Sequence, residues 1–406
     1  MPEAPSGAAA RLEERARQIA RIALTFGATD ARVTLHREQV ATAEIREGHL
    51  QQTRRTFRRV EALLQKDGRQ TVVSTTDLSD AGVSAAFGGA LGELERLPHT
   101  LFPRPAAMPR VDLPPGPFDA LRLVDPALAE PDLDRCVSRA LALRPAQQAG
   151  VSEHSCAMAV ATTSQHAGFS HTHTRAWARL AGGLERRWAA RHLDALPSAD
   201  AIHAKLAGDQ TLLSTPPAPP PDAPVTLVVS PEPAGRLIEA LVGLAPSGAL
   251  PDRLSVIADP WLPGGLASAP FSEAGRALRP VPLIQGGQRR VSLRPGEPPA
   301  PGVLRVGLGG RRLDRMVAEI DDGVLVTGWM SVRVDPGTGM ARLALVGHRI
   351  QAGERTTGLI GARIDTPLPA LFDRLSTVGG DPWAFGRVRS PSLAFSAVQV
   401  HLPSPG

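Results

Sequence analysis

The pattern of apolar and polar positions divides the first hundred residues into a helix, several strands and a second helix. In Ala8–Phe26 apolar residues recur every three or four positions with Glu and Arg between them, which predicts an amphipathic helix ending at Gly27. Asp80–Arg96 has the same spacing, and Asp77 or Ser79 can cap its first turn.

Between these helices apolar and polar residues alternate, as they do in strands with one buried face. Glu47-Gly48 and Asp67-Gly68 lie between such runs and favour tight hairpin turns. Residues 1–98 are therefore predicted to form an α+β domain with an antiparallel sheet. The predicted strands are Ala31–Leu35, Gln39–Arg46, His49–Phe57, Arg59–Gln65 and Thr71–Thr75.

Residues 99–214 are predicted to be a linker followed by a middle region of helices and a hairpin. His99–Pro117 is rich in proline and has no period, which is typical of a linker. Val151–Thr163 and Gly168–Leu180 alternate as strands do and are expected to pair as a hairpin. The remaining predicted elements are a helix over Asp132–Leu143, a strand over Gly182–Asp194 and a short helix over Ser198–Leu206.

Residues 215–406 are predicted to form a β-rich C-terminal domain. The polyproline stretch Thr215–Pro224 marks its start. Val225–Val229 then reads as a buried strand, a turn at Ser230 and Pro231 follows, and a helix runs on to Gly243. Glycine and proline separate the later strands, which suits a barrel or layered sheets. These strands are Ser255–Ala258, Val281–Ile284, Val303–Leu308, Val324–Val334, Ala341–Ile350, Thr357–Ile364 and Ala394–Val400, with a short helix over Pro369–Leu375.

Length and composition indicate a globular protein of two or three domains, since the chain has 406 residues and mixed charge. No apolar run reaches the roughly 18 residues of a membrane span. Met1–Ala10 lacks the pattern of a secretory signal, so we expect a cytosolic protein. Its two cysteines, Cys136 and Cys156, form no CxxC pair, which argues against a zinc ribbon and against a disulfide framework.

Positive charge is modest and comes almost wholly from arginine. The net charge is +5, and the only lysines are Lys66 and Lys205. One basic run, Arg54–Val60, contains a single aromatic residue. On a strand, its arginines would divide between the two faces, so the run favours a solvated hairpin or a subunit contact over a nucleic-acid site.

Several stretches, collinear along the chain, resemble the PmbA/TldD family, whose members are known both as proposed modulators of DNA gyrase and as zinc metallopeptidases. EIREGHLQQTRR and VVSTTDLSDAGV resemble its N-terminal domain, and SEHSCAMAVATTSQHAGFSHTHTRAWARL resembles its middle segment. ADPWLPGGLASAPFSEAG resembles a glycine-containing motif through Gly264, Gly265, Pro270 and Phe271. RSPSLAFSAVQV resembles the closing strand through Ser390, Pro391 and Ser392.

The resemblance implies an α+β N-terminal domain, a β-rich C-terminal domain and a heterodimer of two related subunits. The TldD-type subunit carries zinc on a HExxxH helix, and the PmbA-type (TldE) subunit does not. Here IEALVG stands where that motif would fall, so Ile238, Glu239 and Gly243 occupy its degenerate positions. The resemblance therefore implies no cofactor in this chain and a zinc ion in a TldD-like partner, with a homodimer as the other possibility.

One metal candidate in this chain remains. On a strand, His171 and His173 would share a face, and His166, across a turn at Gly168, would approach them. Three imidazoles would suit zinc. The alternative interpretation is a partly exposed polar hairpin, in which Thr172 and Thr174 are the neighbours.

Other catalytic arrangements are weakly represented. Glu153-His154 and Glu239 are candidate general bases, but a helical acid beside Arg236 is also typical of a surface pair. Ser390 and Ser392 do not lie in a GxSxG elbow. The glycine-rich stretch Gly302–Arg312 lacks GxGxxG spacing before a helix, so no nucleotide is implied.

Three hypotheses follow. The first is a non-catalytic PmbA/TldE-like subunit of a zinc metallopeptidase complex that handles unfolded proteins or extended peptides. The second is a self-contained metallopeptidase with a non-standard site that uses the His166–His173 cluster. The third is a regulatory protein that binds DNA gyrase or nucleic acid through Arg54–Val60.

Overall fold

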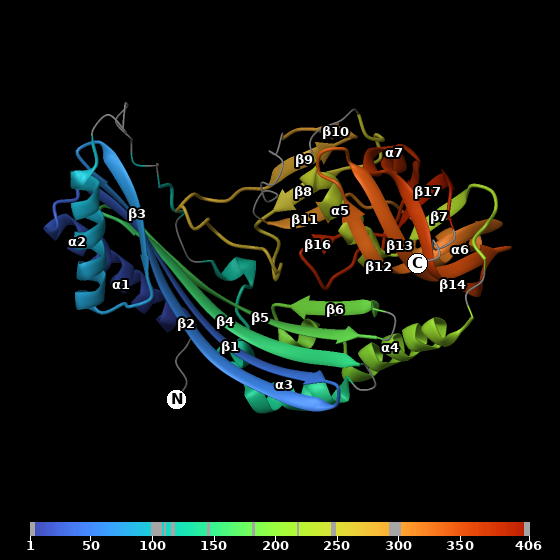
Figure 1. Cartoon of the computed structure of the whole chain (residues 1–406), viewed down its shortest axis with the longest axis horizontal. Helices are drawn as coiled ribbons and strands as arrows, with labels where there is room; N and C mark the ends of the chain where they lie inside the picture. Colours follow the sequence, from blue (N-terminus) through green and yellow to red (C-terminus); the bar gives the residue numbers. More distant parts are fainter. Residues whose placement is uncertain are drawn as a thin grey trace.

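The computed structural model of the chain describes residues 5–98, 108, 111–114, 118–143, 147–180, 183–216, 219–244, 249–291 and 302–401. A long curved sheet, here named the N-terminal sheet, lies beside a more compact half that is built around two further sheets (Figure 1). The predicted α+β class is confirmed. Most of the predicted linker His99–Pro117 lies outside the described residues, as do two residues of the proline stretch 215–224 and Gly182 of the strand predicted over Gly182–Asp194.

The N-terminal sheet is antiparallel throughout and joins strands that are distant in sequence. Its strands are β1 (Asp30–Arg46), β2 (His49–Lys66), β3 (Arg69–Thr75), β4 (Gln148–Thr162), β5 (His166–Arg179) and β6 (Glu185–Ala190). They are arranged in the order β3-β2-β1-β4-β5-β6. Because β1 pairs with both β2 and β4, strands from residues 1–98 and from residues 99–214 share one sheet.

The strands are longer than the alternation predicted. The predicted runs on either side of residues 36–38 are one strand, because β1 pairs without a break with β2 on one side and β4 on the other. The two predicted hairpin turns are confirmed by positive φ angles at Glu47 (49°), Gly48 (80°), Asp67 (51°) and Gly68 (71°), as tight hairpins require.

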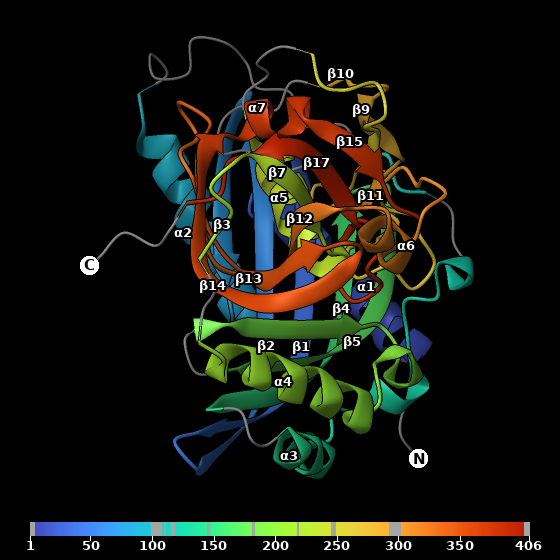
Figure 2. The same ribbon diagram turned by 90° about the vertical axis from the view of Figure 1, so that its right-hand side faces the viewer.

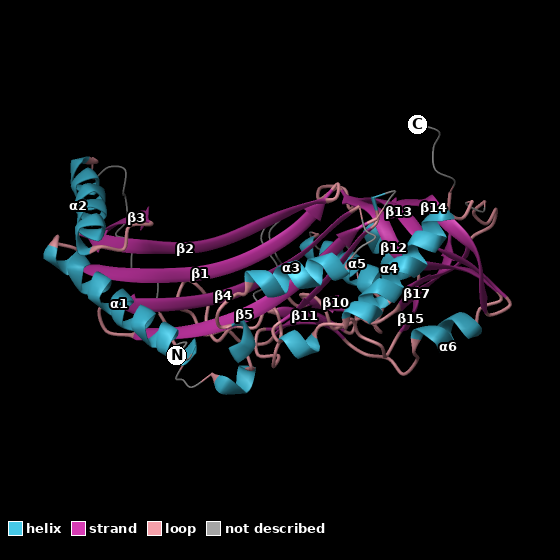
Figure 3. Ribbon diagram, turned by 90° about the horizontal axis from the view of Figure 1, so that it is seen from below, coloured by secondary structure: helices cyan, strands magenta, loops and turns pink. Residues whose placement is uncertain are grey.

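Four helices cover one face of the N-terminal sheet (Figure 3). They are α1 (Pro5–Thr25), α2 (Asp80–Arg96), α3 (Leu133–Ala142) and α4 (Ala199–Ser214), and three 3-10 turns accompany them at Asp119–Leu121, Pro126–Leu128 and Leu193–Ala195. Ser79 caps α2 by accepting from the Gly82 amide, so it, and not Asp77, makes the cap. Buried residues of α1 and α2 pack at one end of the sheet, and those of α3 and α4 pack at the other.

The compact half holds two sheets with α5 (Pro231–Gly243) in the core between them. The second sheet has the order β10-β9-β8-β11-β16, and its strands are β8 (Val256–Asp259), β9 (Val281–Gln285), β10 (Gln288–Arg289), β11 (Val303–Val306) and β16 (Val388–Arg389). The third has the order β14-β13-β12-β7-β17-β15, and its strands are β7 (Val225–Val229), β12 (Asp322–Val334), β13 (Met340–Gln351), β14 (Glu354–Pro367), β15 (Leu375–Val378) and β17 (Leu393–Val398). Helices α6 (Leu313–Ala318) and α7 (Leu368–Asp373) complete this half.

A buried ion-pair network joins the two halves. The Arg186 guanidinium of β6 donates to both carboxylate oxygens of Asp209 on α4, at 2.7 and 2.8 Å. It also donates to Glu232 on α5 at 2.9 Å and to the Thr327 carbonyl oxygen of β12 at 2.7 Å. Figure 2 shows α4 and the third sheet meeting at this end of the N-terminal sheet. Helix α5, which carries the degenerate motif positions, thus contributes Glu232 to the network that joins the two halves.

Candidate functional site

Helix α5 places the degenerate motif positions in three different environments. The Ile238 side chain is fully buried in the core between the second and third sheets. Glu239 points to solvent, and Gly243 offers no side chain. Positions 238 and 243 are five residues apart, and at 3.6 residues per turn they lie about 140° apart around a straight helix.

These residues do not fit a zinc ion. A zinc site needs imidazole, thiolate or carboxylate ligands that converge on one point. The described residues of α5 offer no such set. Within the residues that the structure describes, one group of three or more His, Cys, Asp or Glu side chains is arranged to hold a metal: Cys156, His171 and His173. The candidate metal chemistry of this chain therefore lies on the N-terminal sheet.

The three residues occupy neighbouring positions on the face opposite the helices, here named the histidine face. Cys156 of β4 pairs directly with His171 of β5, and His173 is the next residue of β5 on that face. Their ligand atoms all lie within 4.8 Å of one another. Burial, with the nearby positive charge of Arg191, lowers the pKa of His171 to about 3. Burial also strongly lowers the pKa of His173 and raises that of the Cys156 thiol to about 12.

The prediction that His166 would approach His171 and His173 is wrong. His166 begins β5 itself, so no turn at Gly168 folds it back, and Gly168 pairs with Ala159 inside the strand. His166 comes five positions before His171 and seven before His173, and such odd offsets along a strand put it on the opposite, helix-covered face. There it lies 3.5 Å from Glu13 of α1.

Cys156, the third member of the group, was not predicted from the sequence. The signal that locates it is the β4–β5 turn, because pairing of Ala161 with His166 around that turn fixes the register and sets Cys156 opposite His171.

His154 and Glu38 support this group from neighbouring positions. The His154 ring is stacked on the His173 ring, with centroids 4.2 Å apart and planes 12° apart. His154 Nδ1 lies 2.9 Å from Glu38 Oε1 and its Nε2 lies 3.0 Å from Ser152 Oγ. Glu38 also accepts from the Cys156 thiol at 3.8 Å.

Glu153, predicted as a candidate base, is structural. Its side chain is fully buried and accepts two hydrogen bonds of 2.6 Å from Arg135, and a third from the Asp132 amide. A buried carboxylate with both oxygens engaged in this way anchors α3 to the sheet, and these three hydrogen bonds occupy most of its acceptor positions.

The Ser-Pro-Ser segment and the Gly-Gly segment are also structural. Ser390 and Ser392 are fully buried, and the Ser392 hydroxyl donates to Asp381 at 2.8 Å. Pro391 lies between them and its carbonyl accepts from Ser390.

The Gly-Gly segment, with Gly264 at φ +66°, lies against the histidine face. The Gly265 carbonyl accepts from Arg191, and buried Phe271 packs edge-on against Phe169, with centroids 5.0 Å apart. Pro270 accepts a backbone hydrogen bond from Leu278, which closes the loop.

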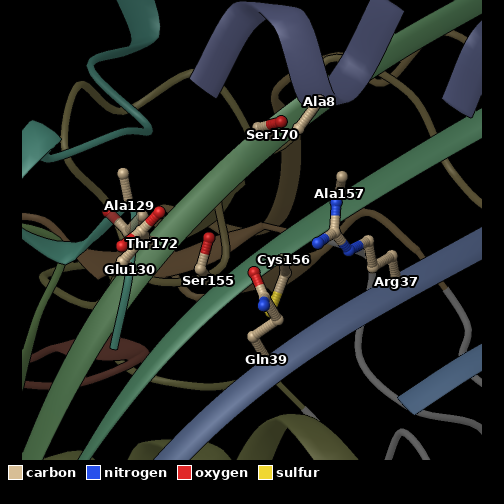
Figure 4. A pocket seen from close by; sticks show the side chains of 10 residues that line it. All are labelled: Ala8, Arg37, Gln39, Ala129, Glu130, Ser155, Cys156, Ala157, Ser170 and Thr172. Carbon is tan, nitrogen blue, oxygen red and sulfur yellow. The ribbon is translucent and has the colours of Figure 1, made fainter. Parts of the chain in front are cut away.

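A polar cavity of about 110 Å³ opens between α1, the start of α3 and the helix-covered face of the sheet (Figure 4). Arg37 and Gln39 of β1, Ser155 of β4 and Ser170 and Thr172 of β5 line it. Glu130 and Cys156 also line it, and no histidine is among the described residues of this lining.

The basic run Arg54–Val60 behaves as predicted. The register with β1 places Arg54 and Arg58 on one face and Arg55 and Arg59 on the other, and all four are exposed. The glycine-rich stretch 302–312 is followed by α6, which has only six residues and is not preceded by the spacing of a nucleotide loop. None of the described helices combines the length and the apolar character that crossing a bilayer demands.

Known proteins share part of this sequence and almost all of this fold. Residues 287–402 match the model of the PmbA/TldA metallopeptidase C-terminal domain. No curated protein sequence matches the chain. The fold is similar to that of a candidate modulator of DNA gyrase from Bacteroides thetaiotaomicron, at 19% identity and a TM-score of 0.78, covering 96% of this chain and 98% of that one.

Two further structures share the fold. TldE from Thermococcus kodakarensis has 15% identity and a TM-score of 0.78, covering 96% of this chain and 100% of its own. A candidate DNA gyrase modulator from Thermotoga maritima has 17% identity and a TM-score of 0.75, covering 96% and 99%. Residues 287–402 therefore belong to the PmbA/TldA metallopeptidase C-terminal domain family, and almost the whole length of the chain has the fold of these three structures.

Proposed function

We propose that the chain is the non-catalytic, TldE-like subunit of a cytosolic TldD/PmbA-type zinc metallopeptidase complex that degrades unfolded proteins or peptides. One observation carries the proposal: on α5 the motif positions hold a core isoleucine, an exposed glutamate and a glycine. The catalytic zinc is then supplied by a TldD-like partner. The fold shared with a protein named TldE supports the assignment.

The N-terminal sheet provides a means of holding an extended peptide. Within the described part of the chain, residues 49–59 of β2 pair with β1 on one side only, because β3 pairs with residues 60–66. An exposed edge of this kind can bind an extended peptide as an added strand through main-chain hydrogen bonds. Such binding places few demands on the side chains of the peptide. The substrate we propose is therefore an extended peptide of loose sequence preference.

The test compares the chain alone with the chain mixed with a HExxxH-bearing relative from the same cell. We expect peptide cleavage only in the mixture, together with a heterodimer on size-exclusion chromatography. Glu239→Gln should leave the activity of the mixture unchanged, whereas the same change in the HExxxH glutamate of the relative should abolish it. Cleavage of peptide by the chain alone, lost in His171→Ala/His173→Ala, would establish the self-contained peptidase instead.

A nucleic-acid role would be supported by salt-sensitive DNA binding that is lost when Arg54, Arg55, Arg58 and Arg59 are changed together. We expect no such binding, because these arginines point to opposite faces of the sheet.

A further inference from the structure

We propose that Cys156, His171 and His173 form a zinc site on the histidine face of the N-terminal sheet. The site is separate from α5 and does not depend on the proposed partner role. One thiolate and two imidazoles are a donor set that zinc prefers, and three protein ligands leave a fourth position for water or another ligand.

The backbone already brings the three ligands together. Cys156 and His171 are a direct cross-strand pair, and His173 follows on the same face of β5. Adjacent ligands of a tetrahedral zinc ion lie roughly 3.3–3.7 Å apart, given its usual bond lengths. Ligand atoms within 4.8 Å of one another are therefore within about 1–1.5 Å of that spacing.

Two buried nitrogen atoms of the site have no hydrogen-bond partner among the residues that the structure describes. His171 Nδ1 and His173 Nε2 make no hydrogen bond and are shielded from solvent, and His173 as a whole is only 8% exposed. A buried polar atom without a partner carries a desolvation cost that native structures rarely leave uncompensated. A zinc ion between the two rings would coordinate both nitrogens.

Glu38 provides a route for the thiol proton. Zinc binds the thiolate, so Cys156 must lose its proton when the Zn–S bond forms. The Glu38 carboxylate, which accepts from this thiol, takes that proton, and its side chain is 39% exposed and can release it to water. The step leaves one Zn–S bond, one carboxylic acid that re-ionises, and no change in oxidation state.

The surroundings hold the site in place and set its charge. Stacking against His154 fixes the plane of the His173 ring. Arg191, held by the carbonyls of Gly265, Leu266 and Ser268, contributes positive charge nearby, as does Arg175. The negative charges of the Cys156 thiolate and the Glu38 carboxylate offset the two positive charges of zinc. The bound ion therefore adds no net positive charge beside Arg191 and Arg175.

The experiment measures metal binding by the purified full-length chain without a partner. We expect one Zn²⁺ per chain in equilibrium dialysis. Co²⁺ in its place should give a thiolate-to-cobalt charge-transfer band that disappears in Cys156→Ser. Glu38→Gln should weaken zinc binding roughly 10–100-fold, as loss of a supporting group does, and His173→Gln should weaken it further.

Two matched controls separate this site from other thiols and histidines. His166→Ala changes a histidine on the opposite face of the same strand, and Cys136→Ala changes the other cysteine; both should bind zinc as the unchanged chain does. Circular dichroism checks that each variant is folded. Absence of zinc binding, retention of the charge-transfer band in Cys156→Ser, or binding of Cu⁺ without Zn²⁺ would overturn the assignment. Zinc binding without peptide cleavage leaves the proposed partner role intact.

Discussion

Replacing Arg186 by methionine should lower the free energy of unfolding by about 3–5 kcal/mol, the usual cost of removing one partner from a buried ion pair. The Arg186 side chain is 1% exposed, and that of Asp209 is 3% exposed. The Glu232 side chain is 22% exposed, and its partial burial already raises its pKa. Without the guanidinium, Asp209 keeps only Lys205 as a cationic partner, and Glu232 has none among its described contacts.

Urea denaturation measures this effect, and a neighbouring arginine provides the control. Arg187 follows on the same strand, but its side chain is 76% exposed and pairs with Glu185 on the surface. Arg187→Met should change stability by less than about 0.5 kcal/mol, because exposed pairs contribute little. Equal losses for the two variants would show that the buried network does not stabilise the joint between the halves.

Introducing a histidine at the first position of the zinc motif should lower the stability of the protein without creating a metal site. Ile238→His removes a fully buried aliphatic side chain and puts an imidazole without a partner among apolar residues. The expected loss is about 2–5 kcal/mol, because a polar group without a partner is costly to bury and the flat ring does not fit the space shaped for isoleucine.

The double change Ile238→His/Gly243→His extends the test to function. Space exists for a side chain at 243, where a Cβ atom would meet nothing within 4 Å. The imidazole at 238 would lie among apolar core side chains, which provide no further zinc ligand, so we expect no zinc at α5 and no peptidase activity. Glu239→Gln, on the exposed side of the same helix, should leave stability unchanged. A stable double variant that binds zinc and cleaves peptide would contradict our account of α5.

Local patterns were sufficient to predict much of the fold. The hairpin turns at Glu47-Gly48 and Asp67-Gly68, the second helix and the β7–α5 unit follow from spacing and turn residues alone. Strand order could not be predicted in this way, because the pairing of β1 with β4 joins segments a hundred residues apart, and no local pattern encodes that contact.

The short elements and the metal group were missed for different physical reasons. Strands β10 and β16 have two residues each, too few to show a period, and α6 has six. The shared face of His171 and His173 followed from strand alternation and is confirmed. Cys156 depended on a cross-strand register, and His166 depended on whether Gly168 turns the chain or continues the strand.

The two hydrophobic clusters on the helix-covered face have a consequence for how the N-terminal sheet folds. One end of β1 contributes Ala31, Val33 and Leu35 to the cluster with α1 and α2, and the other end contributes Ala41, Ala43 and Ile45 to the cluster with α3 and α4. Because β1 belongs to both clusters, detaching it from one would also expose the apolar residues of the other. The two clusters should therefore unfold cooperatively. Helices from both ends should therefore melt in a single transition, although no described side chain of α1 or α2 packs in the cluster of α3 and α4.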